Sequence, residues 1–85
     1  MNADIRPTYA ALRAALRAHG GGAGALTGLT ELATVLRDQR RLAPAAAAQW
    51  LRERHPTLGE RTPLEVWLEG RADRVIDAAR AEGAA

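Results

Sequence analysis

The sequence has no cysteine, no serine and no lysine, and each absence narrows the chemistry open to the chain. Without cysteine there are no disulfides, no thiol nucleophiles and no cysteine-based metal sites. Without serine the commonest hydroxyl nucleophile is missing as well. We therefore expect a protein that is not an enzyme, with no catalytic residues, no bound metal and no cofactor.

The excess of positive over negative charge is also small. The 12 basic residues, all arginine, face 10 acidic residues, which leaves a formal net charge of +2. That excess provides little of the phosphate-neutralising charge that non-specific nucleic-acid binding requires. No apolar run approaches the roughly 20 residues needed to cross a bilayer, and no signal peptide opens the chain. We expect a cytoplasmic protein that does not contact the membrane.

Large apolar side chains are few, because alanine supplies half of the hydrophobic residues in this chain of 85. A core built from so few large side chains gives an isolated monomer only marginal stability. Self-association as a homodimer, or a fold completed on a partner, is therefore a physical expectation.

Alanine, leucine, arginine and glutamate dominate the composition and β-branched residues are sparse, which favours helices over strands. Apolar spacing and helix breakers predict helices over residues 7–19, 28–41, 44–54, 63–69 and 71–82, with Thr27 as N-cap of the second. We predict an all-α fold, a small bundle of four to five short helices. The glycine-rich run at 20–24 reads as a flexible tether. It would divide the chain into an N-terminal helix with its tether (1–25) and a helical domain (26–85).

The sharpest local pattern is Thr62-Pro63-Leu64-Glu65. Threonine at the N-cap, proline at the first helical position and glutamate two residues further on predict a capping box. Gly70 follows at the position where a left-handed residue ends such a short helix.

The histidines and tryptophans have plain structural explanations. His19 precedes a glycine run and His55 precedes a proline, so we expect both at solvated helix ends, without partners at metal-ligand spacing. Trp50 and Trp67 read as core anchors. Trp67, on a short helix, is also a candidate interface residue, because tryptophan is enriched at binding hot spots.

A helix-turn-helix is the main structural alternative, with Arg6, Arg13 and Arg17 as its phosphate contacts. The glycine-rich connection is too long for this motif, and the start of the second helix lacks the side chains that read base edges. We do not expect this chain to bind DNA alone.

One longer pattern resembles a known family. It comprises Gln49-Trp50-Leu51, the stretch from His55 to Gly70, Arg74-Val75-Ile76-Asp77 and, upstream, the helix at 29–36. In this order and spacing the segments resemble the toxin-binding domain of Xre/MbcA/ParS-type antitoxins, over residues 29–83. Such antitoxins often carry an N-terminal helix-turn-helix, and the segment before Leu29 does not match one.

The resemblance implies a bacterial type II toxin–antitoxin system. The partner would be a cognate RES-domain toxin that consumes NAD, and the antitoxin would cover the toxin's NAD-binding cleft. The residues expected to contact the toxin are Arg61, Trp67, Arg71, Arg74 and Arg80, although solvated helix charge explains each arginine equally well. The residues expected to shape the loop and helices are Trp50, Gly59, Thr62, Pro63, Leu64, Glu65, Gly70 and Val75. A small DNA-binding regulator and a helical self-association module remain the alternative functions.

Overall fold

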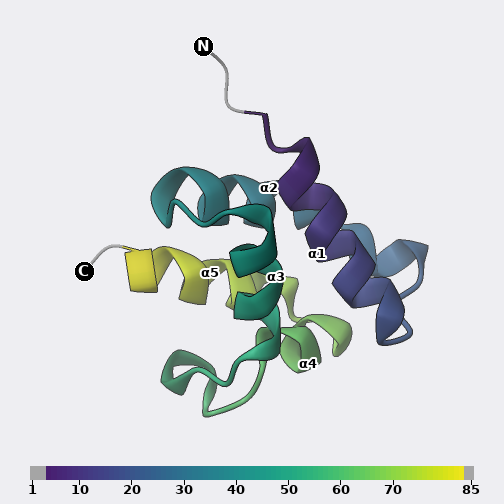
Figure 1. The fold of residues 1–85 in the computed structure, drawn as a ribbon. Coiled ribbons are helices and arrows are strands. Elements are labelled where there is room, and N and C mark those ends of the chain that lie inside the picture. Colours follow the sequence, from purple (N-terminus) through teal and green to yellow (C-terminus); the bar gives the residue numbers. More distant parts are fainter. Residues whose placement is uncertain (1–3, 84–85) are drawn as a thin grey trace.

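Five α-helices form in the computed structural model over residues 4–83, the part of the chain that it describes, and this range holds no β-strand (Figure 1). They are α1 (Arg6–Ala18), α2 (Leu29–Thr34), α3 (Pro44–Arg52), α4 (Pro63–Leu68) and α5 (Ala72–Gly83). The predicted all-α bundle is confirmed. None of the helices within the described range is long and apolar enough to cross a membrane.

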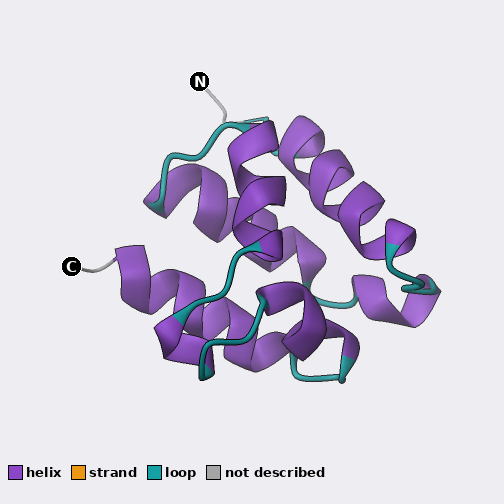
Figure 2. Ribbon diagram, turned by 60° about the horizontal axis from the view of Figure 1, so that its bottom comes forward, coloured by secondary structure: helices purple, strands orange, loops and turns teal. Residues whose placement is uncertain are grey.

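Three short helical turns complete the fold, and loops join the elements (Figure 2). They are the 3-10 turns η1 (Ala23–Leu26) and η3 (Pro56–Leu58), and the π-helix η2 (Val35–Gln39). η2 continues α2 directly, so the helix predicted over residues 28–41 changes its winding halfway. The widened turn appears where the Arg40 amide donates to the Val35 carbonyl, five residues back, at 3.1 Å.

The predicted N-cap of this second helix is wrong. Gly28, with φ +86°, occupies the N-cap position of α2, and no side chain caps the helix there. The positive φ explains why glycine occupies this N-cap position, because glycine adopts left-handed backbone without the steric cost that threonine would meet.

α1 belongs to the same core as the rest of the molecule. It packs against α2 and α3, while α5 packs against α4 and α2. Leu12 and Leu16 of α1 are fully buried, in one cluster with Leu32, Leu51 and Val75 from the other helices. The division of the chain at residue 25 stays a prediction, and the structure adds that the two parts share one core.

The end of α5 is fastened by the carboxylate of Glu82. Its oxygens accept hydrogen bonds from Trp50 Nε1 at 3.0 Å, Arg40 at 3.1 Å and Thr57 Oγ1 at 2.9 Å. His55 Nδ1 lies 3.1 Å from the same group, and His55 Nε2 lies 3.1 Å from the Trp50 carbonyl oxygen. His55 is therefore buried between two oxygen atoms, and the prediction that it sits at a solvated helix end is wrong. We call these residues the Glu82 network.

Candidate functional site

The capped start of α4 fixes the geometry of the candidate surface. Thr62 Oγ1 accepts from the Glu65 amide at 3.1 Å, and the Thr62 amide donates to Glu65 Oε1 at 3.0 Å. The predicted capping box is therefore confirmed. The hydrogen bonds from the backbone and side chain of Thr62 hold the pKa of Glu65 below its ordinary value. Pro63, at the start of α4, is buried and has no amide that would need a partner.

Tight turns on either side of α4 hold the flanking chain close to it. Gly59 and Gly70 have left-handed backbone, with φ of +69° and +89°. The His55 amide donates to the Arg61 carbonyl at 3.1 Å, which closes the loop between them. As a result the loop, α4 and the start of α5 come together. Of the residues expected to shape this region, the structure buries Trp50, Pro63, Leu64 and Val75.

A small hollow lies where these three segments meet. It has a volume of about 180 Å³ and is lined by Leu58, Arg61, Val66, Glu69, Arg71 and Arg74. We call it the arginine pocket. Three of the four arginines expected at the interface therefore line one site, although they belong to the loop, the turn after α4 and the first turn of α5.

Arg61 is already engaged by a carboxylate inside the pocket. Its guanidinium donates to Glu69 in a two-pronged contact, with Nη1 and Oε1 2.9 Å apart. This contact holds the pKa of Glu69 below its ordinary value. Both side chains are nearly half exposed, at 44% and 43%. An ion pair this exposed is worth little, because water screens it on the open side.

Arg71 and Arg74 have no such partner. Both are exposed, and within residues 4–83 neither forms an ion pair. They also lie at the start of α5, where the helix dipole disfavours cations, with only Asp73 of the first turn to offset them. Helix stability therefore does not explain two arginines here.

The remaining two predicted contact residues lie elsewhere. Arg80 is ion-paired with Glu31 of α2 and does not line the pocket. Trp67 is only 2% exposed, and its indole N–H donates to the Ala25 carbonyl. The structure supports the core-anchor interpretation of Trp67, and its contact with a partner stays a prediction.

Two features of this region were missed in the sequence. Leu68 is 38% exposed and is the exposed large hydrophobic residue of the described range. Helical spacing from Leu64 would have placed it in the core. Glu69 is bonded to Arg61 across eight residues of chain, a separation outside the i, i+3 and i, i+4 pairs that helical spacing predicts.

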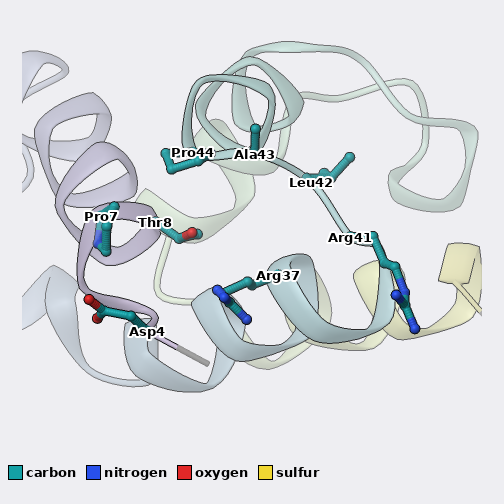
Figure 3. A pocket seen from close by; sticks show the side chains of 8 residues that line it. All are labelled: Asp4, Pro7, Thr8, Arg37, Arg41, Leu42, Ala43 and Pro44. Carbon is teal, nitrogen blue, oxygen red and sulfur yellow. The ribbon is translucent and has the colours of Figure 1, made fainter. Parts of the chain in front are cut away.

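A wider hollow of about 500 Å³ lies between the start of α1 and the segment after η2 (Figure 3). Figure 3 shows Asp4 and Arg37 near one end and Arg41 at the other. Arg37 is paired with Asp38 at 3.0 Å, and Asp4 is paired with Arg6 at 3.0 Å. Most charged residues that line this wider hollow are therefore ion-paired within the chain, unlike those of the arginine pocket.

The arginines of the helix-turn-helix alternative are also partly engaged. Arg6 is held by Asp4, and the Arg13 guanidinium lies over the Tyr9 ring, 5.9 Å from its centroid. α1 itself packs on the core through its apolar face.

Residues 26–78 match the antitoxin Xre/MbcA/ParS C-terminal toxin-binding domain family. The match takes in α2, η2, α3, α4 and the first half of α5, and with them every residue that lines the arginine pocket. No curated protein and no solved structure matches the chain.

Proposed function

Since the chain belongs to the family of C-terminal toxin-binding domains of Xre/MbcA/ParS antitoxins, we propose that it is the antitoxin of a type II toxin–antitoxin system. Its partner is a RES-domain toxin that degrades NAD in the bacterial cytoplasm. The chain acts as a binding domain without a reaction of its own. The observation that carries the proposal is the family match, which spans the whole arginine pocket.

The antitoxin works as a plug. It covers the NAD-binding cleft of the toxin and keeps the substrate out. The binding face includes the loop at 57–61, α4 and the first turns of α5. The rigid cap at Thr62 and the left-handed turn at Gly70 support this assignment, because they fix the face before the partner arrives.

Arginine is well suited to such a face, since its planar guanidinium forms paired hydrogen bonds with carboxylates and other acceptors. Arg61, Arg71 and Arg74 would make the central contacts. Arg80, held by Glu31 on the neighbouring helix, would lie at the edge of the same interface.

Cells provide the first test. The product of the adjacent gene, which we expect to be a RES-domain toxin, is expressed alone and together with this chain, and cellular NAD is followed. We expect NAD to collapse with the toxin alone, to recover on co-expression, and the two proteins to co-purify. If NAD stays level and nothing co-purifies, the chain is not the antitoxin of that protein.

Purified proteins test directly whether the antitoxin occludes the NAD-binding cleft. Antitoxin binding and NAD binding should exclude each other, so raising the concentration of NAD should weaken antitoxin association in proportion. An antitoxin that inhibits the toxin but binds equally well at saturating NAD would contradict occlusion of the cleft.

A further inference from the structure

We propose that the arginine pocket is a receptor for one carboxylate side chain of the partner, and that Glu69 is its internal competitor. This inference rests on the proposed function for the identity of the partner, and it adds the chemistry that the partner must present. The partner surface should carry an aspartate or glutamate that Arg71 and Arg74 grip, over a floor made by Leu58 and Val66.

The size of the pocket favours a side chain as its occupant. Its volume of about 180 Å³ is below the roughly 300 Å³ at which ligand pockets begin. A dinucleotide could not enter it, whereas the end of an acidic side chain could. Leu58 and Val66 are almost fully buried, at 9% and 5% exposure, so the floor is firm and apolar.

The charge of the pocket favours an anion. Three guanidinium groups face a single carboxylate, which leaves two positive charges uncompensated at the lining. Arg71 and Arg74 supply both, since neither has an ion-pair partner in residues 4–83. A carboxylate from the partner would complete the pairing that the chain itself leaves open.

Glu69 already shows how a carboxylate binds here. Its two oxygens accept from the Arg61 guanidinium, in the geometry that a partner carboxylate would use with the neighbouring arginines. Because the Arg61–Glu69 pair is nearly half exposed, it opens at little cost. Glu69 also repels an incoming carboxylate. The pocket is therefore partly self-occupied, and removing the Glu69 charge should improve binding.

The first experiment compares affinities for the RES-domain partner. Arg71→Gln and Arg74→Gln should each weaken binding by about tenfold, the effect of losing a charge-assisted hydrogen bond. Glu69→Gln should tighten binding by about two- to fivefold, in line with the small value of an exposed ion pair. Arg41→Gln is the matched control, because it removes the same charge from an arginine that lines the other hollow.

The signs of these effects decide the proposal. Unchanged affinity in Arg71→Gln and Arg74→Gln would overturn the site. Affinity at or below the wild-type value in Glu69→Gln would overturn the role of the competitor. Circular dichroism of each variant checks that the helices are intact, and since all four residues are exposed we expect no loss of fold.

A second experiment needs no toxin. A capped tetra-glutamate peptide is titrated into the protein, and the arginine Nε–Hε signals are followed by NMR. Arg71 and Arg74 should shift more than Arg41, and Arg61 should join them in Glu69→Gln. Equal shifts at all arginines would overturn the pocket. If these shifts appear but the RES-domain protein does not bind the wild-type chain, the proposed function fails and the carboxylate site stands.

Discussion

At the scale of single residues, Glu82 is the most heavily bonded side chain in the described chain. Burial alone would raise the pKa of this carboxyl group. The hydrogen bonds from Trp50 and Thr57 and the charges of His55 and Arg40 outweigh burial, so the pKa lies below its ordinary value of 4.5. The folded state therefore holds the ionised form of Glu82 more strongly than the unfolded chain does.

The sign of the pH dependence follows. A carboxyl group whose pKa is lower in the folded state adds stability above its unfolded pKa, and this is lost as pH falls through its folded pKa. Glu82→Gln should lower the free energy of unfolding at pH 7 by about 1–3 kcal/mol. The difference from wild type should shrink as pH falls below 4.5. Urea unfolding at several pH values measures it, with Asp77→Asn, exposed on the same helix, as control.

The capping box makes a second prediction at this scale. Thr62→Ala leaves the Glu65 amide without its side-chain acceptor and should cost about 1 kcal/mol. In a domain of this size that corresponds to a melting temperature lower by roughly 4–8 °C. Thr62→Ser keeps the hydroxyl and should melt close to wild type. Equal melting of the alanine and serine variants would show that the cap adds no stability.

At the scale of elements, the end of η2 is strained. Arg41 has φ +55°, a left-handed conformation that costs a side-chain-bearing residue roughly 1–2 kcal/mol. The turn is held by the Leu42 amide, which donates to the Leu36 carbonyl at 2.9 Å, as at a helix end that usually carries glycine. The strain is local to one residue, so a single substitution can relieve it.

We therefore expect Arg41→Gly to raise the free energy of unfolding by about 0.5–1 kcal/mol, the strain relieved less the added freedom of the unfolded chain. Gln39→Gly, two residues earlier within η2, should lower the free energy of unfolding by a similar amount. Chemical denaturation of the two variants gives opposite shifts of the midpoint. A loss of stability in Arg41→Gly would show that its side chain contributes more than the backbone strain removes.

Elements whose signals lie within a few residues could be predicted from the sequence. The capping box at Thr62 and the turn at Gly70 depend on neighbours along the chain, and both appear as expected. The burial of His55 could not be predicted, because its partner Glu82 lies on another helix. The π-helical winding of η2 likewise has no signal in the apolar spacing that predicts a helix over residues 28–41.

At the scale of the whole molecule, α1 is part of the core. Leu16 is fully buried among residues of the other helices, so Leu16→Ala should cost about 2–5 kcal/mol, as should Leu51→Ala in α3. If α1 were joined to the rest of the molecule only by a flexible linker, Leu16→Ala would cost little stability. Thermal unfolding compares the two variants, and Ala14→Gly at an exposed site of α1 controls for helix propensity alone.

Part of the candidate site could also be predicted from the sequence. The sequence predicts Arg61, Arg71 and Arg74 as contact residues, and the fold brings all three to one pocket. It also predicts Arg80, which is ion-paired with Glu31 of α2 and does not line this pocket. Which arginines are free depends on where each acidic residue lies in space, and spacing along a helix does not determine that for contacts between helices.

The two tryptophans have a practical consequence. Trp50 lies against the His55 ring, 4.8 Å between centroids, and is bonded to Glu82, whereas Trp67 is buried in α4 and donates to the Ala25 carbonyl. Trp67→Phe leaves the emission of Trp50, which reports on the end of α5 because its indole N–H donates to Glu82. Trp50→Phe leaves the emission of Trp67, which reports on α4, a helix of the proposed binding face. The chain thus carries two built-in optical probes, which can time the arrival of a partner without any attached dye.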